Sequence, residues 1–157
     1  MTLFRDKLFI GATLFFIALY ALFCRYNVLF NYTHSLPQKI FIVDVGNKNL
    51  KVGDYAAFHS EHLPNTLNGM KIIKIISGVQ GDVVDVKDNE VFINNKYLTK
   101  IYTRKAIWGE ITPIDKTVIP KDCYFMEGTA RTSFDSRYKE FGLICKDQII
   151  GKAFPYF

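Results

Sequence analysis

The sequence lacks the side-chain clusters that hold metal ions. It has three cysteines and three histidines among 157 residues, and neither type recurs with carboxylates at the spacing of metal ligands. We therefore expect no metal site and no cofactor. Internal repeats and low-complexity tracts are absent as well, so the chain does not have the pattern of a repeat protein.

Runs of basic residues are also lacking, although the chain is basic. The formal net charge is +5 and the sequence pI is about 9.0, but the lysines are scattered and form no nucleic-acid-binding motif. We expect no nucleic-acid partner. A basic, solvated surface of this kind is suited to anionic lipid headgroups, so membrane lipid is an expected partner.

Formal charge is missing from one long segment, Leu8–Cys24, which lies between Lys7 and Arg25. A bilayer core needs roughly 17 to 25 apolar residues, and this segment is just long enough, which predicts one N-terminal transmembrane helix. A cleaved signal would need a small-x-small site, but Phe23 stands where a small residue is required. The short leading end and the large following domain favour a cytoplasmic N-terminus and an exported C-terminal domain.

The rest of the chain lacks strong helical periodicity. We expect residues 1–25 to form the membrane anchor and residues 26–157 to form one exported domain, mostly β. Turn residues separate short β-branched or aromatic runs, and Asp88–Asn89 is typical of a hairpin turn. The predicted strands are Lys39–Val43, Asp54–Phe58, Lys71–Ile76, Asp82–Val86, Glu90–Ile93 and Cys123–Met126. The region from Tyr97 to Lys121, broken by two prolines, receives no element.

A serine and a lysine stand out as candidate catalytic residues. The hydroxyl of Ser35 needs a neighbouring base to become a nucleophile, and a lysine can serve in a Ser-Lys arrangement if it is neutral. Lys74 alternates with isoleucines on both faces of its predicted strand, so burial would lower its pKa from the usual value of about 10.4. Alternation alone does not exclude Lys71, which lies nearer the start of the strand.

Four ordered motifs resemble those of the type I signal peptidase family, and within it the TraF-type conjugative-transfer peptidases. Asn31, Thr33, Ser35, Leu36 and Pro37 match the nucleophile segment N-x-T-x-S-L-P. Lys74 keeps the family's spacing to Gly78, Gly81 and Asp82, Ser133–Tyr138 matches S-x-D-S-R-Y and is followed by Gly142, and Leu50–Asp54 resembles the segment between nucleophile and base. The resemblance implies a signal-peptidase-type β fold and selects Lys74 over Lys71.

The resemblance also implies a role for each matched residue. Ser35 would attack the scissile carbonyl, and Lys74 would act as the general base. Ser133 would orient the lysine, while Thr33 and the backbone N–H of Ser35 would bind the oxyanion. Asp135 and Arg137 are expected to share a strand face with Ser133 and to form an ion pair that positions it, the alternative being a surface salt bridge of little value.

Histidine is not expected to replace the lysine. His34 adjoins Ser35, but neighbouring residues on an extended chain point to opposite faces. Three departures from the family pattern, Lys39, Gln80 and Glu127–Thr129, put a housekeeping role in doubt and favour the conjugation branch.

Substrate recognition is expected beside the nucleophile. An extended peptide is expected to add to the backbone near Tyr32–Ser35 and Ile72–Lys74, with small apolar pockets that select small residues before the cut. Tyr32, Leu36 and Ile73 are the candidate substrate-binding residues. Ordinary core packing is the competing interpretation for Leu36 and Ile73.

The expected function is that of a membrane-anchored serine endopeptidase. Its substrate would be a pre-protein, most specifically a conjugative pilin precursor, cut at the periplasmic face of the bacterial inner membrane. Two alternatives remain open: a general signal peptidase with many secretory clients, and a noncatalytic anchored β module of an export complex. A self-cleaving repressor is disfavoured because the chain has no DNA-binding segment.

Two cysteines flank the Ser133 motif. Cys123 and Cys145 lie in segments that could pair as neighbouring strands, and a disulfide between them suits an oxidising compartment. The sequence leaves this open because it does not show whether the two Cα atoms approach within about 7 Å.

Overall fold

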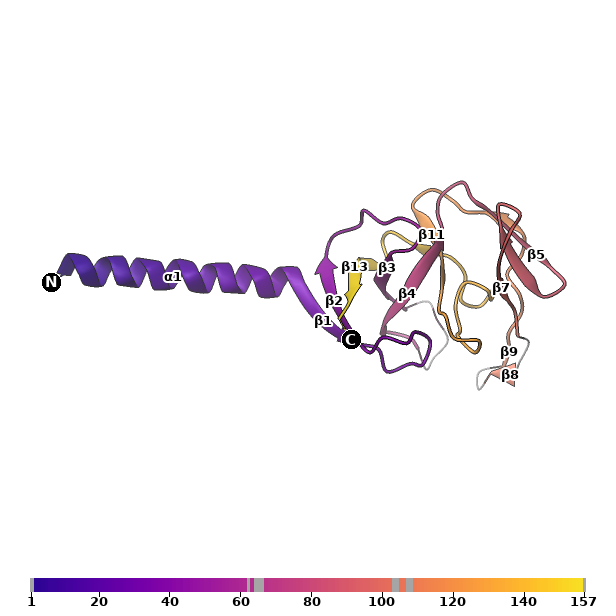
Figure 1. Cartoon of the computed structure of the whole chain (residues 1–157), viewed down its shortest axis with the longest axis horizontal. Helices are drawn as coiled ribbons and strands as arrows, with labels where there is room; N and C mark the ends of the chain where they lie inside the picture. Colours follow the sequence, from indigo (N-terminus) through magenta and orange to yellow (C-terminus); the bar gives the residue numbers. More distant parts are fainter. Residues whose placement is uncertain (1, 62, 64–66, 103–104, 107–108, 157) are drawn as a thin grey trace.

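A long N-terminal helix leads into a β-rich body (Figure 1). This computed structural model describes residues 2–61, 63, 67–102, 105–106 and 109–156. Helix α1 (Thr2–Arg25) projects away from the strands and runs directly into β1 (Tyr26–Phe30). Within the described part of the chain, no helix combines the length and the hydropathy that a membrane crossing requires. The anchor over Leu8–Cys24 stays a prediction.

The main sheet has seven antiparallel strands in the order β1-β2-β13-β3-β4-β11-β12. The last strand of the chain therefore lies inside the sheet, between two strands from its first half. The bounds of the other strands are β2 Ile40–Val45, β3 Tyr55–His59, β4 Lys71–Gly78, β11 Cys123–Glu127, β12 Ile144–Cys145 and β13 Ile149–Pro155.

A second sheet of four strands has the order β10-β5-β6-β7. Its strands are β5 Val83–Lys87, β6 Glu90–Ile93, β7 Lys96–Lys100 and β10 Thr117–Val118, and a separate two-stranded ladder joins β8 (Lys105–Ala106) to β9 (Gly109–Glu110). The predicted hairpin is confirmed. Asp88 and Asn89 have φ values of +52° and +60°, the left-handed conformation that a two-residue turn between antiparallel strands requires.

Every strand predicted from the sequence is present, with bounds that differ by at most about two residues. The expected mostly β fold is confirmed. The prediction missed β1, β7 to β10 and β13, so the region from Tyr97 to Lys121, which received no element, does contain short strands. In β13, Gly151 and Pro155 interrupt the apolar pattern. Gly151 is required by close packing, because a Cβ there would lie 2.0 Å from the backbone oxygen of Asp44 on β2.

The hydrophobic core divides into two clusters on opposite faces of β4. Ile76 belongs to the larger cluster, together with Phe58 and Phe125. Ile73 belongs to the smaller one, which lies near β2 and β13. Lys74 points to the opposite face from Ile73, as the alternation along this strand predicts.

A disulfide joins β11 to β12. Cys123 and Cys145 are directly opposite in the register of this pair, and their Cα atoms are 4.0 Å apart. The pairing that the sequence left open is therefore confirmed. It fastens both ends of the segment that carries Ser133.

Candidate active site

Ser35 lies in a tight turn between β1 and β2. The turn is closed at its base, where the backbone N–H of Asn31 donates to the carbonyl of Lys39 at 2.8 Å. The side chain of Leu36 is buried in the smaller core cluster, and this packing attaches the turn to the core. Ser35 is itself only 6% exposed. Its hydroxyl therefore lies in a site with little access to water.

Lys74 is buried on β4 and is only 3% exposed. Its Nζ donates a 2.7 Å hydrogen bond to Oγ of Ser133. Burial lowers the pKa of Lys74 to about 8, an effect that the Asp135 carboxylate partly opposes and the Arg137 guanidinium reinforces. About a tenth of the lysine is therefore neutral at pH 7, the form that a lysine base requires.

Ser133 is carried by the loop between β11 and β12, and this loop packs directly on the turn of Ser35. The backbone N–H of Ala130 donates to the carbonyl of Ser35 at 3.1 Å. A Cβ at Gly128 would lie 2.4 Å from Oγ of Ser133 and 2.6 Å from the carbonyl oxygen of Ser35. Only a glycine lets the two segments approach this closely.

A buried ion pair holds the same loop in shape. Arg137 Nε lies 2.7 Å from Asp135 Oδ1, and both side chains are almost completely buried. Arg137 Nη2 also donates to the carbonyl of Ser133 at 3.2 Å, while Asp135 Oδ2 accepts from the N–H of Gly128 at 2.9 Å. The expected ion pair is thus present, and the surface alternative is wrong.

The expectation of a shared strand face for these residues is also wrong. Residues 133–138 form loop and turn, with a single bridge from Tyr138 to Pro113. Arg137 acts on Ser133 through the backbone carbonyl rather than through alternation along a strand. The S-x-D-S-R-Y motif therefore encodes a hydrogen-bonded loop.

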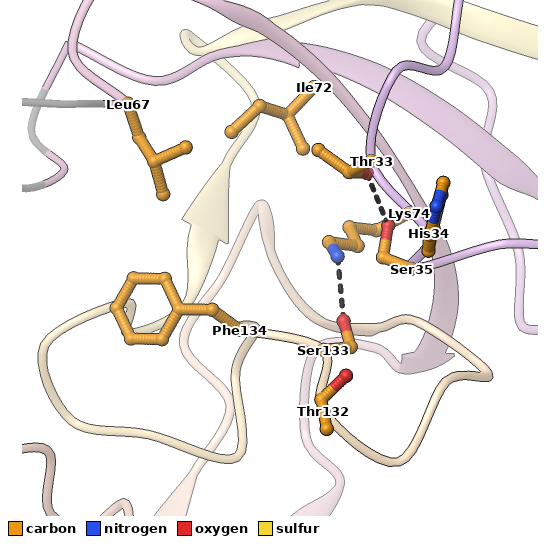
Figure 2. A pocket seen from close by; sticks show the side chains of 9 residues that line it. All are labelled: Thr33, His34, Ser35, Leu67, Ile72, Lys74, Thr132, Ser133 and Phe134. Atoms are coloured by element: carbon orange, nitrogen blue, oxygen red, sulfur yellow. Dashed lines mark hydrogen bonds between the residues drawn. The ribbon is translucent and has the colours of Figure 1, made fainter. Parts of the chain in front are cut away.

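These segments enclose a cavity of about 200 Å³. Figure 2 shows Ser35, Lys74 and Ser133 around it, with the Lys74 amine and the Ser35 hydroxyl on the same side. Its lining side chains are Thr33, His34, Ser35, Leu67, Ile72, Lys74, Thr132, Ser133 and Phe134.

Two hydrogen bonds organise the polar side of this cavity. The hydroxyls of Thr33 and Ser35 are 2.9 Å apart, and Lys74 contacts Ser133 rather than Ser35 among the described hydrogen bonds. Contacts between nucleophile and base are often long in a substrate-free site and tighten on binding. Ser35 is therefore hydrogen-bonded to Thr33, and Lys74 is hydrogen-bonded to Ser133.

His34 reaches the cavity, contrary to the argument from an extended chain. The segment around Ser35 is a turn, so neighbouring side chains are not forced to opposite faces. In Figure 2, His34 lies beside Ser35, on the side away from the Lys74 amine.

The candidate substrate-binding residues are placed differently from one another. Tyr32 is 83% exposed, and together with Ile73 it lines a smaller neighbouring cavity of about 50 Å³. Leu36 is not among the side chains that line either cavity, and it packs in the core with Phe41. For Leu36 the structure agrees with the core-packing interpretation.

Sequence reasoning missed the apolar walls of the larger cavity, which are Leu67, Ile72 and Phe134. Ile72 could have been found, because it lies two residues before Lys74 on one strand face. Phe134 lies inside the S-x-D-S-R-Y motif. Leu67 comes from a segment without a sequence signal.

The chain is similar in sequence to several signal peptidases. The family model described as "Signal peptidase, peptidase S26" matches residues 3–157. The chain is 30% identical to Signal peptidase I T of Bacillus subtilis (strain 168) over 122 residues, which cover 68% of this chain and 58% of that relative. It is 34% identical over 86 residues to the Probable signal peptidase I-2 of Synechocystis sp., covering 54% of this chain and 37% of the relative.

The chain spans about half the length of the curated relatives it matches. Among solved structures, a crystal structure of a signal peptidase I from Enterococcus faecalis V583 aligns with a TM-score of 0.44 at 23% identity. The alignment covers 68% of this chain and 98% of that one.

Proposed function

Because the chain belongs to the signal peptidase family, peptidase S26, we propose that it is a serine endopeptidase with Ser35 as nucleophile and Lys74 as general base. One observation carries the proposal. A buried lysine, whose pKa is lowered to about 8, shares a cavity with a nearly buried serine that lies in a tight turn. A lysine kept partly neutral beside a serine has the chemistry of a Ser-Lys pair.

The first half of the reaction would form an acyl-enzyme. Neutral Lys74 takes the proton of the Ser35 hydroxyl while Oγ bonds to the scissile carbonyl carbon. The carbonyl oxygen becomes an oxyanion, which accepts hydrogen bonds from the Thr33 hydroxyl and from the backbone N–H of Ser35. Protonated Lys74 then gives its proton to the leaving amine as the C–N bond breaks.

The second half would release the new carboxyl end. Lys74, neutral again, takes a proton from a water molecule that attacks the acyl carbon, and the bond to Ser35 breaks with return of that proton to Oγ. Ser133 supports both halves because its bond to Nζ limits the positions that the lysine can adopt. Asp135 and Arg137 act indirectly, by fixing the loop that carries Ser133.

The substrate would bind as an added strand. The ladder between β4 and β11 includes Ile75 and Gly78 but does not extend to Lys74. Ile72–Lys74 therefore offers a backbone edge next to the turn of Ser35, where an extended peptide can pair. The cavity of about 200 Å³ has room for a small apolar side chain before the scissile bond.

Membrane attachment is part of the proposal. Large apolar side chains are exposed along α1, among them Phe9, Phe16 and Phe23, and an apolar surface of this kind is unfavourable in water. The Leu8–Cys24 segment would anchor the chain in the bacterial inner membrane as a single span. The Cys123–Cys145 disulfide fits a β-rich body on the periplasmic, oxidising side.

Two classes of pre-protein are candidate clients. The N-x-T-x-S-L-P form of the nucleophile segment favours a conjugative pilin precursor. The relatives named as signal peptidases I favour signal-peptide-bearing secretory proteins. Deletion in a conjugative host separates them: loss of pili without accumulated pre-proteins supports the pilin client, whereas accumulated pre-proteins support the general enzyme.

The proposed chemistry is tested by cleavage of both precursors with purified full-length protein in detergent. We expect product from the wild type, and none above background from Ser35→Ala or Lys74→Ala, with unchanged thermal unfolding of Ser35→Ala as evidence of folding. Lys71→Ala, an exposed lysine on the same strand, should retain activity. Cleavage that survives Ser35→Ala would exclude the proposed nucleophile, and a wild type inactive on both precursors would favour the noncatalytic module.

A further inference from the structure

The turn that presents Ser35 is held by one amide side chain, that of Asn31. Its Nδ2 donates to the carbonyl of Leu36 at 3.2 Å and to the carbonyl of Gln38 at 3.0 Å. Its Oδ1 accepts from the Thr33 hydroxyl at 2.7 Å. Asn31 therefore contacts the segments on both sides of the nucleophile without touching Ser35 itself.

The direction of these bonds follows from their partners. Two backbone carbonyls can only accept, so the nitrogen of the Asn31 amide must face them and its oxygen must face Thr33. The Thr33 hydroxyl has a single proton, which it donates to Oδ1. In the 2.9 Å contact between the two hydroxyls, Ser35 is therefore the donor and Thr33 the acceptor.

We propose that Asn31 is a positioning residue for the nucleophile, acting through the Thr33 hydroxyl. Ser35 donates to Thr33, Thr33 donates to Asn31, and the Asn31 amide is fixed by two carbonyls of the turn. Hydrogen bonds in such a chain polarise and strengthen one another. The inference rests on the proposed function, because it assigns Asn31 a role in orienting the hydroxyl that Lys74 would deprotonate.

The same chain has a consequence for the reaction. While Thr33 donates to Asn31, its proton is not available to the oxyanion. When the carbonyl oxygen of the substrate enters, the Thr33 proton must turn from Asn31 towards it, and the Ser35 proton must turn from Thr33 towards Lys74. Asn31 thus holds the Thr33 and Ser35 hydroxyls in one defined orientation before the substrate enters. Each hydroxyl then needs a single rotation to reach its orientation in the reaction.

A double-mutant cycle tests this inference. Asn31→Ala should lower kcat about threefold to tenfold, the usual effect of one lost hydrogen bond, with KM nearly unchanged. Thr33→Val should lower kcat more, about 100-fold to 1,000-fold if its hydroxyl serves the oxyanion. The double variant should be no slower than Thr33→Val alone, because Asn31 then has no hydroxyl to act upon.

Two further variants serve as controls. Thr33→Ser keeps a hydroxyl, so adding Asn31→Ala to this variant should still lower kcat. Asn47 ties another turn through its side chain, by a 2.7 Å bond to Asp44. Asn47→Ala should therefore reduce stability without lowering kcat.

Thermal unfolding of the same set of variants provides a readout that does not need activity. The Tm losses of Asn31→Ala and Thr33→Val should be less than additive if their side chains are bonded. Additive losses in both Tm and kcat would show that Asn31 only ties the turn, and would overturn the proposal. Cleavage that persists in Ser35→Ala would instead overturn the proposed function, while the Tm cycle would still report the bond.

Discussion

Lys74 and Ser133 form a hydrogen bond of 2.7 Å between side chains that are both almost completely buried. The two residues lie 59 positions apart in the sequence, on β4 and on the loop that follows β11. A lysine amine in such a site meets water only through the cavity that it lines, and its bond to Ser133 restricts its rotation. Its proton exchange is thereby directed to the cavity that also contains Ser35.

The rate of cleavage should rise with pH. The proposed base works only when neutral, and burial lowers the pKa of Lys74 to about 8. At pH 7 about a tenth of the molecules would have a neutral Lys74, and at pH 9 about nine tenths. We expect kcat/KM to increase through an apparent pKa near 8 and to level off above it, as measured with a short peptide. A flat profile from pH 6 to 10 would contradict this assignment.

Replacement of Lys74 by methionine should abolish activity but stabilise the fold. The folded state binds the proton of Lys74 less tightly than the unfolded state, whose lysine has its ordinary pKa of 10.5. Wild-type stability should therefore rise with pH between about 8 and 10.5. Lys74→Met removes this dependence and should add on the order of 1 to 3 kcal/mol at pH 7, less the loss of the Ser133 bond.

Chemical unfolding at pH 7 and at pH 10 measures both effects of this substitution. Lys71→Met is the matched control, because Lys71 is exposed on the same strand. It should leave stability within about 0.5 kcal/mol of the wild type. Equal pH dependence in Lys74→Met and wild type would mean that Lys74 is not the titrating group.

Gly128→Ala should damage the site more than the fold. The added methyl group would meet Ser133 Oγ and the carbonyl oxygen of Ser35 at 2.4 and 2.6 Å, so the two segments must separate. We expect a loss of about 1 to 3 kcal/mol in stability and a fall in kcat of at least about 100-fold.

Gly78→Ala provides the comparison for Gly128→Ala. Its Cβ would meet Ile119 Cδ1 at 2.7 Å, in the core and away from Ser35. We expect a similar stability loss with kcat within about threefold of the wild type. Equal kcat losses in the two variants would argue against a specific role for the contact at Gly128.

Arg137→Met should unfold the loop that carries Ser133. Asp135 would be left buried without its charge partner, which typically costs about 3 to 5 kcal/mol. Lys139→Met breaks an exposed pair with Asp115 and should change stability far less, because water screens this pair. Denaturant unfolding measures the free energy of unfolding of both variants. Equal losses of stability would show that the buried pair contributes no more than the exposed one.

The disulfide should be visible by alkylation and intact mass. Under denaturing conditions without reductant, one cysteine, Cys24, should react, and all three should react after reduction. Reduction should lower stability by about 3 kcal/mol, the typical value for a loop of this length. Three reactive thiols before reduction would show that the bond does not form.

Much of the fold follows from local sequence patterns. Particular residues show which parts of it depend on contacts that are distant in the sequence. Strands such as β4 and β6 could be predicted because their apolar residues have the period that burial of a strand requires. β13 could not, since Gly151 is selected by its contact with Asp44, on a strand about 100 residues earlier. The pattern of β13 makes sense only once its neighbours are known.

The site divides in the same way. Ser35 and Lys74 were predicted from motifs that keep their spacing along the chain. The loop conformation of Asp135 and Arg137 was not, because an alternating polar pattern is compatible with both a strand and a hydrogen-bonded turn. The bond of Asn31 to Thr33 depends on the conformation of a turn that residue types alone do not define.

The position of β13 has a consequence for the order of folding. This strand pairs with β2 on one side and with β3 on the other, so these two early strands have no direct partner in each other. Ser35 precedes β2, and Lys74 lies on β4, beyond β3. During synthesis we expect Ser35 and Lys74 to lie on separate hairpins, β1–β2 and β3–β4, until Ile149–Pro155 pairs with both β2 and β3. We therefore expect Ser35 and Lys74 to come together only when β13 joins the sheet.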